Sequence, residues 1–346
     1  MATSSSTQSP VRPTTLRKRI LTAVARVLGA VATVIFIAWI AVAQPSCRRG
    51  TPANATVEQE SLRRHVETLA VQFHPRDWQH RENLDAGADY IAEHFKQAGA
   101  AVDFEPFTLG GRVYRNIHGR FAVGTTPRIV VGAHYDAFDE LPGADDNASA
   151  VAVLLELATL LGAMDSPPPV DLVAYTLEEP PFFGTEQMGS AVHAKSLGDQ
   201  AGSIRGIIVL EMVGYFSDEW GSQSYPLPLL YVMYPCRGNF ISVVSKWDQG
   251  EWVKAVKVAM KGTTDLPVYS LRAPAAVPGI DFSDHRNYWP HRIPSLMVTD
   301  TAFYRNKAYH TAEDTPDRLD YRRMSQVTLA VFAAVQSLST VALPSR

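Results

Sequence analysis

Apolar residues recur at helical spacing near the start of the folded part of the chain. Two segments, 57–70 and 83–97, follow this spacing, and Gly99 ends the second. Residues 101–107 and 112–121 then alternate in polarity around Gly110-Gly111. This alternation predicts two strands joined as a β-hairpin.

Short apolar runs alternate with longer helical patterns over the rest of the chain. The runs predict buried strands at residues 128–134, 170–177, 206–213, 229–233 and 295–299. Helices are predicted at residues 148–161, 186–196, 240–260 and 321–338. This alternation favours an α/β fold with helices on both faces of a sheet. Ligands of such folds gather at the carboxyl ends of the strands.

The first 56 residues have a different pattern. Residues 1–19 are polar, end in Arg17-Lys18-Arg19, and predict a disordered basic tail. Residues 20–43 are apolar apart from Thr22, Arg26 and Thr33, which is sufficient length to span a bilayer. Residues 44–56 read as a polar linker, and one folded domain is expected over residues 57–346.

The basic residues before the apolar segment favour a cytoplasmic N-terminus and an exported domain. Ala41-Val42-Ala43 also resembles a signal-peptidase site. Residues 20–43 are therefore either a transmembrane anchor or a signal segment. The domain is expected in the periplasm or outside the cell, held at the membrane or secreted after cleavage.

Charge and cysteine content exclude some partners and some kinds of site. The net charge of −3 indicates no nucleic-acid partner. Two cysteines, Cys47 and Cys236, are too few for a disulfide framework or a four-cysteine zinc site. A single disulfide between them remains open at this stage.

Acidic and histidine side chains lie at the ends of three predicted strands and in two loops. Such groups are costly to bury unless something compensates for their charge, and a bound divalent metal does so. Two histidines and three carboxylates suit two zinc ions that share one bridging carboxylate. Singly, each residue also fits an ordinary role, such as a helix cap or a solvated strand end. The segments concerned are His134-Tyr135-Asp136, Asp145-Asp146-Asn147, Glu178-Glu179, Glu211 and His310.

The order and spacing of these motifs resemble the M28 family of zinc aminopeptidases, which also has carboxypeptidase-like and glutaminyl cyclase branches. The resemblance runs from about Val57 to the C-terminus. It implies a three-layer α/β/α sandwich around a mixed, largely parallel sheet. It also implies two zinc ions per chain and peptides as substrates.

The resemblance assigns a role to each matching residue. His134 and Glu211 would bind one zinc, Glu179 and His310 the other, and Asp146 would bridge them. Asp136 would orient the His134 ring, and Glu178 would be the general base. Within Ser283-Asp284-His285, the last two residues would flank the substrate.

These roles imply an exopeptidase that removes N-terminal residues with a zinc-activated water and Glu178 as base. The family usually has Asp where this chain has Glu211, which puts metal occupancy in question. Two alternatives stay open. One is a glutaminyl-peptide cyclase, which usually works with one zinc, and the other is a catalytically silent binding domain.

Overall fold

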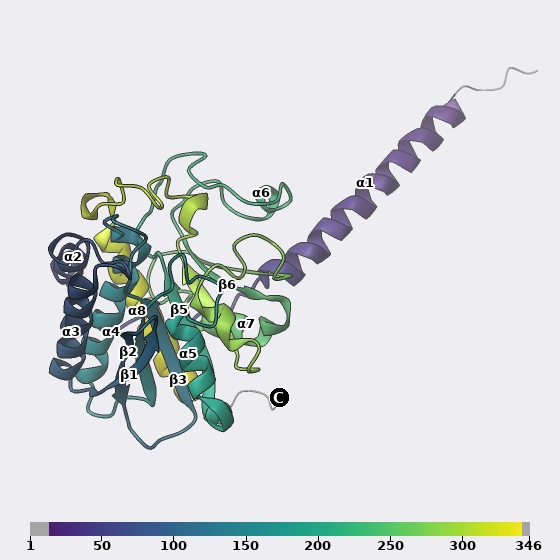
Figure 1. Ribbon diagram of the computed structural model, residues 1–346. Coiled ribbons are helices and arrows are strands. Elements are labelled where there is room, and N and C mark those ends of the chain that lie inside the picture. Colours follow the sequence, from purple (N-terminus) through teal and green to yellow (C-terminus); the bar gives the residue numbers. More distant parts are fainter. Residues whose placement is uncertain (1–13, 341–346) are drawn as a thin grey trace, which may run out of the picture. The chain divides into compact units, whose positions relative to one another are not determined.

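A computed structural model describes residues 14–340 of the chain (Figure 1). The chain divides into two units, residues 1–42 and 43–346. In the first unit, helix α1 (Thr14–Ala43) begins earlier than predicted, so Arg17, Lys18 and Arg19 are helical rather than part of a disordered tail. The rest of that predicted tail lies outside the described residues.

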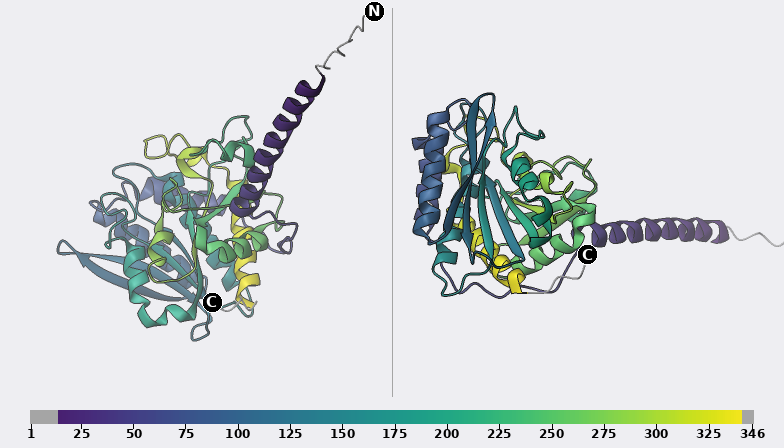
Figure 2. Two further views of the ribbon diagram at one scale, coloured as in Figure 1. Left: turned by 90° about the vertical axis from the view of Figure 1, so that its right-hand side faces the viewer. Right: turned by 60° about the horizontal axis from the view of Figure 1, so that its bottom comes forward.

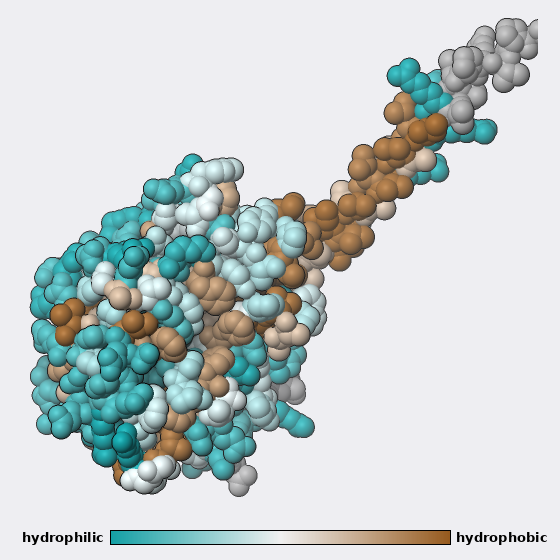
Figure 3. Space-filling view, turned by 45° about the horizontal axis from the view of Figure 1, so that its top comes forward, coloured by the Kyte–Doolittle hydropathy of each residue, from teal (hydrophilic) through white to brown (hydrophobic). Residues whose placement is uncertain are grey.

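Helix α1 has the length and composition of a membrane span. Its 27 residues from Arg17 to Ala43 are apolar enough to cross a bilayer, and a signal sequence would pass the same test. Figure 3 shows the apolar side chains that cover this helix beyond its basic start. The structure therefore agrees with a membrane anchor or a signal segment.

One eight-stranded sheet forms the centre of the second unit. Its strand order is β1-β2-β4-β3-β5-β8-β6-β7. The central pairs β4–β3, β3–β5 and β5–β8 are parallel, whereas β1–β2, β2–β4 and β8–β6 are antiparallel. The strands are β1 (Ala101–Leu109), β2 (Arg112–Phe121), β3 (Arg128–His134), β4 (Val170–Tyr175), β5 (Ile204–Glu211), β6 (Ile241–Lys246), β7 (Val268–Ala273) and β8 (Ser295–Thr299).

Helices cover both faces of this sheet, as Figures 1 and 2 both show. The larger apolar core lies under α2 (Gln59–Glu67), α3 (Arg81–Gln97), α4 (Ala150–Gly162), α7 (Gly250–Met260) and α8 (Tyr321–Thr340). A smaller core lies on the other face, under α5 (Gly189–Ser196). The predicted α/β/α sandwich around a mixed, largely parallel sheet is confirmed.

Two predicted elements are wrong, and both lie after β5. Residues 229–233 were expected to form a strand but contain the short helix α6 (Leu230–Met233), where Tyr231 and Val232 are exposed. The helix expected over residues 240–260 is instead β6 followed by α7. The apolar run of β6 suits either structure locally, and its pairing with β7 and β8 decides the outcome.

The predicted linker packs against the domain. The backbone N–H of Gly50 donates to the Lys261 carbonyl at 2.8 Å. The Lys257 ammonium, only 4% exposed, donates to the Gln44 carbonyl in the linker and to the preceding Ala43 carbonyl at 2.7 Å. The compact unit therefore begins at Ala43 rather than at Val57. Cys47 and Cys236 are both free thiols, so the disulfide that the sequence left open is not formed.

Candidate active site

Three neighbouring parallel strands bring acidic and histidine side chains to one edge of the sheet. Strand β3 ends at His134, β5 ends at Glu211, and Glu178 and Glu179 follow the end of β4 between them in sequence. Parallel strands have their carboxyl ends at the same edge, so residues far apart in sequence meet there. The segment Ala144–Ser149 carries Asp146 into this group, and the loop before α8 carries His310.

Asp146 lies between the two histidines. Its Oδ1 is 3.4 Å from Nε2 of His134, and its Oδ2 is 3.2 Å from Nε2 of His310. Glu211 Oε2 lies 3.4 Å from the His134 nitrogen, and Glu179 Oε2 lies 3.3 Å from the His310 nitrogen. Each histidine thus has its own carboxylate, and the two oxygens of Asp146 serve both.

These distances fit metal ligands. Two ligands on one tetrahedral zinc, each 2.0–2.1 Å from the ion, lie roughly 3.3–3.4 Å apart. Nε2 of His134, Nε2 of His310 and Oε1 of Glu179 are buried without a hydrogen-bond partner among the described residues. Buried polar atoms of a folded protein normally have partners. The residues present therefore fit bound metal, which these atoms would hold.

The charges of the site also indicate bound metal. Burial, together with the nearby Asp146 carboxylate, raises the pKa of Glu179 to about 8. Burial also raises the pKa of Glu178 well above its ordinary value, and Glu211 and Glu179 add to the rise. Several carboxylates so close together are costly to ionise without cations. Divalent metal would remove this cost.

Asp145 and Asn147, the sequence neighbours of Asp146, form hydrogen bonds with other parts of the chain. The Asp145 carboxylate accepts the Gly214 N–H and the Asn306 amide, both at 2.9 Å. The Asn147 side chain accepts the Met212 N–H at 2.9 Å. Because these two residues are tied to the segment after β5, only Asp146 is left to bind metal.

Asp136 holds two parts of the site. Nδ1 of His134 lies 3.1 Å from the Asp136 carbonyl and 3.5 Å from its carboxylate. The carboxylate oxygens accept the backbone N–H groups of Glu178 at 3.2 Å and Glu179 at 3.1 Å. Asp136 therefore lies beside the His134 ring and holds the backbone of Glu178 and Glu179, and its role in orienting the ring stays a prediction.

Glu178 lies beside the metal ligands without pairing closely with either histidine. Its Oε2 is 3.8 Å from Nε2 of His134. It lines a cavity of about 260 Å³ together with Asp146, Glu179, Glu211 and His310. A carboxylate with a raised pKa at this position suits proton transfer.

Asp284 and His285 do not reach the cavity. Both are fully buried, and neither is among the described residues that line it. The Ser190 hydroxyl donates to Asp284, whose charge contributes to the raised pKa of Glu178. His285 donates from Nε2 to the Ile280 carbonyl at 2.8 Å. The structure thus places both side chains in the protein interior, outside the described lining of this cavity, and the substrate contact stays a prediction.

Sequence reasoning did not identify several supporting residues. Phe138 and Tyr309 stack on the two faces of the His310 ring, with centroids at 4.0 and 3.8 Å. Ser283 donates to Glu211 Oε2 at 2.8 Å, and Asp314 accepts the Asp146 N–H at 3.1 Å. Ser283 begins the Ser283-Asp284-His285 segment named above, and Tyr309 and Asp314 lie within four residues of His310 in the sequence. No local signal marks Phe138.

The chain is similar in sequence to a protein family and to known proteins. A family model, peptidase family M28, matches residues 116–335. YfbL of Escherichia coli (strain K12) is 48% identical over 285 residues, which cover 80% of this chain and 87% of YfbL. A probable leucine aminopeptidase of Arthroderma otae is 24% identical, covering 79% of this chain and 70% of that protein.

Solved structures share the fold. The aminopeptidase LapA of Legionella pneumophila has a TM-score of 0.65 at 19% identity, covering 83% of this chain and 73% of LapA. A glutaminyl cyclase of Bacteroides thetaiotaomicron has a TM-score of 0.62 at 22% identity, covering 81% of this chain and 98% of that one. Since the family model matches well over half of the chain, the protein belongs to peptidase family M28 and is a metal-dependent hydrolase.

Proposed function

We propose that the protein is an aminopeptidase that uses two zinc ions per chain. The observation that carries the proposal is Asp146, whose two oxygens face His134 and His310 separately, at 3.4 and 3.2 Å. A site for a single metal does not need a carboxylate shared in this way. His134 and Glu211 complete one ligand set, and His310 and Glu179 complete the other.

The roles of the protein groups follow from their positions. When bound, the metal ions supply Lewis-acid chemistry, polarising the scissile carbonyl and making a water molecule more acidic. Glu178 takes the proton from the attacking water and passes it to the leaving amine. Asp136 holds Glu178 in position through the backbone, and the two aromatic rings keep His310 from turning.

An apolar pocket adjoins the cavity and indicates which class of substrate the protein binds. It shares Glu211, Phe282, Phe303 and Tyr309 with the wall of that cavity. The remaining wall is largely aromatic and aliphatic and includes Tyr225, Tyr234, Phe240, Val244, Leu271 and Met297. Such a pocket binds an apolar side chain by removing it from water. We therefore expect a preference for peptides that begin with a large apolar residue, consistent with the leucine aminopeptidase among the relatives.

The catalytic domain would act outside the cytoplasm. Arg17, Lys18 and Arg19 precede the apolar part of α1, and basic residues favour the cytoplasmic side. The domain that follows Ala43 would then be exported. External protease should digest this domain in spheroplasts while cytoplasmic proteins stay intact. Protection until the cells are lysed would contradict this placement.

One set of assays tests the proposed reaction. The purified protein with zinc should release leucine from a leucyl peptide and leave the N-acetylated peptide intact. Equal cleavage of both peptides would exclude an aminopeptidase. Release of ammonia from a glutaminyl peptide, without hydrolysis of either peptide, would show a cyclase. Bound zinc without any turnover would leave a binding domain.

A further inference from the structure

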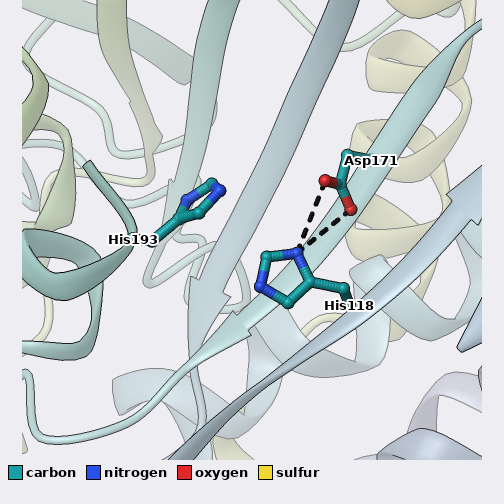
Figure 4. Close-up of side chains that lie close together, drawn as sticks. All are labelled: His118, Asp171 and His193. Carbon is teal, nitrogen blue, oxygen red and sulfur yellow. Dashed lines mark hydrogen bonds and ion pairs between the residues drawn. The ribbon is translucent and has the colours of Figure 1, made fainter. Parts of the chain in front are cut away.

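A second group of metal-ligand side chains lies on the α5 face of the sheet (Figure 4). It consists of His118 from β2, Asp171 from β4 and His193 from α5. These residues are 2%, 7% and 2% exposed, and one ligand atom from each lies within 4.8 Å of the others. Figure 4 shows the His193 side chain extending from its helix toward the other two.

This group is separate from the candidate active site. Asp171 precedes Tyr175, the last residue of β4, by four residues, which is about 13 Å along a strand. Glu178 and Glu179 lie beyond that end. None of the three residues is among those described as lining the active-site cavity. The reaction proposed above uses none of them.

The distance between His118 and Asp171 is long for a charge-assisted hydrogen bond. Asp171 also pairs with Arg120, whose Nε lies 3.3 Å from Oδ2. Nδ1 of His118 lies 3.4 Å from each carboxylate oxygen of Asp171. Hydrogen bonds between a charged nitrogen and a carboxylate are shorter, about 2.7–2.9 Å. The part-buried pair of His80 and Asp77, for comparison, is 2.6 Å apart. A separation of 3.4 Å instead equals the edge of a zinc tetrahedron, roughly 3.3–3.4 Å, and matches the His134–Asp146 distance at the first site.

The outer nitrogens of both histidines also fit bound metal. Ligand histidines normally use their second nitrogen to hydrogen-bond a carboxylate, carbonyl or water, which fixes the ring. Nδ1 of His193 lies 2.7 Å from the Tyr288 hydroxyl, which leaves Nε2 for a metal. Nε2 of His118 is buried without a hydrogen-bond partner in the described chain, and Glu105 Oε2 lies 3.6 Å away.

We propose that His118, Asp171 and His193 bind a third zinc ion. Two imidazoles and one carboxylate are suitable zinc ligands, and a water molecule would take the fourth position. The ion would tie β2 and β4 to α5. Helix α5 also carries Ser190, which donates to Asp284 behind the active site. The third ion would therefore stabilise the segment that holds Asp284.

A proton on His118 is the alternative to a metal ion between these three side chains. Burial lowers the pKa of His118, but Asp171 and Glu105 outweigh this and raise it to about 9. A protonated His118 between two carboxylates would need no metal. Burial and the neighbouring His118 lower the pKa of His193 to about 4, so His193 is neutral in both cases and available as a ligand. Metal content separates the two occupants.

The test is the zinc content of the full-length protein purified in detergent, dialysed against buffer with low micromolar zinc and measured by elemental analysis. We expect three zinc ions per chain for the unaltered protein and two for His118→Gln and His193→Gln. The matched control is His94→Gln on α3, a histidine outside both groups, which should retain three. Two ions in the unaltered protein, unchanged by His118→Gln, would overturn the proposal.

A second measurement does not depend on the variants folding. Anomalous X-ray scattering at the zinc edge, from crystals of the unaltered protein, should show a peak between His118, Asp171 and His193. Peaks at the Asp146 site alone would overturn the third site and leave the proposed peptidase reaction standing. A third peak together with failure of the aminopeptidase assay would support the third zinc site and overturn the proposed peptidase reaction.

Discussion

The carboxylate of Asp136 accepts the backbone N–H of Glu178 at 3.2 Å, so the residue that fixes the proposed base follows a different strand from the base itself. Asp136→Asn keeps the size of the side chain but replaces one accepting oxygen with an NH₂ group. The Glu178-Glu179 segment should then shift. We expect kcat to fall about 10–100-fold, the usual effect of losing an outer partner at a metal site.

The readout for Asp136→Asn is kcat and KM together with zinc content. A purely structural role would lower stability and leave kcat per folded molecule unchanged. That result would contradict the positioning role. Asp85→Asn, on the exposed surface of α3, is the matched control and should change neither quantity.

Glu178→Gln should abolish most turnover and leave the metals bound. The amide keeps the size of the side chain but cannot accept the proton, and removal of a general base costs about 10²–10⁴-fold. Glu179→Gln should instead lower zinc content, because an amide oxygen is a weaker ligand than a carboxylate. Kinetics and elemental analysis of both variants check the assignment. Loss of zinc in Glu178→Gln with zinc kept in Glu179→Gln would reverse it.

Glu211→Asp should keep activity within about tenfold, a change of roughly 1.4 kcal/mol in the barrier. The carboxylate remains, but the shorter side chain draws it away from the Ser283 hydroxyl, which donates to it at 2.8 Å. Ser283→Ala provides the comparison, since it removes this hydrogen bond without moving the ligand. Complete loss of activity in Glu211→Asp would mean that the metal position requires the longer side chain.

Removal of metal should destabilise the protein more at pH 8 than at pH 6. Without metal, burial and Asp146 raise the pKa of Glu179 to about 8, above its unfolded value of 4.5. The stability contributed by a raised pKa is complete below the unfolded pKa and is lost as the pH rises through the folded pKa. Asp146 and Glu179 likewise overcome the burial effect and raise the pKa of His310 to about 10, with the same sign.

The measurement is the melting temperature with and without a chelator at both pH values. The loss on chelation should be larger at pH 8. An equal loss at both values would mean that the carboxylates do not hold protons when metal is absent. The double variant Glu179→Gln, His310→Gln should reduce the pH dependence.

A chain that begins at Ala43 should be more stable than one that begins at Val57. Lys257 is buried and donates to the Ala43 carbonyl at 2.7 Å and also to the Gln44 carbonyl. Without residues 43–56 this ammonium loses both acceptors, and an unsatisfied buried group costs about 1–3 kcal/mol, or more when charged. Melting temperatures of the two truncated chains test this. Lys257→Met should reduce the difference in melting temperature between the two chains. Equal melting temperatures of the two unsubstituted chains would contradict the prediction.

Much of the fold was predictable because its signals are local. The strand Ser295–Thr299 has the predicted bounds, and the hairpin of β1 and β2 turns at Gly110-Gly111 as expected. The candidate metal ligands were also predictable, since acidic and histidine residues directly after apolar runs stand out in one dimension. The family is confirmed. The roles of the single residues in the reaction stay predictions.

Other features depend on contacts between distant residues. The run Ile241–Lys246 became a strand only because β7 and β8 lie beside it, and the polar linker became part of the domain because Lys257 and Lys261 lie against its carbonyls. Phe138 reaches His310 from a part of the sequence with no motif.

The sequence by itself determined the apolar periodicity, the membrane-length segment and the types of ligand available, because each depends on neighbouring residues in the chain. Only the tertiary structure decided that Asp146 faces both histidines and that Asp284 lies behind the cavity rather than in it. It also brought His118, Asp171 and His193 together from β2, β4 and α5. Strand pairing and burial set these distances, and neither can be read from local order alone.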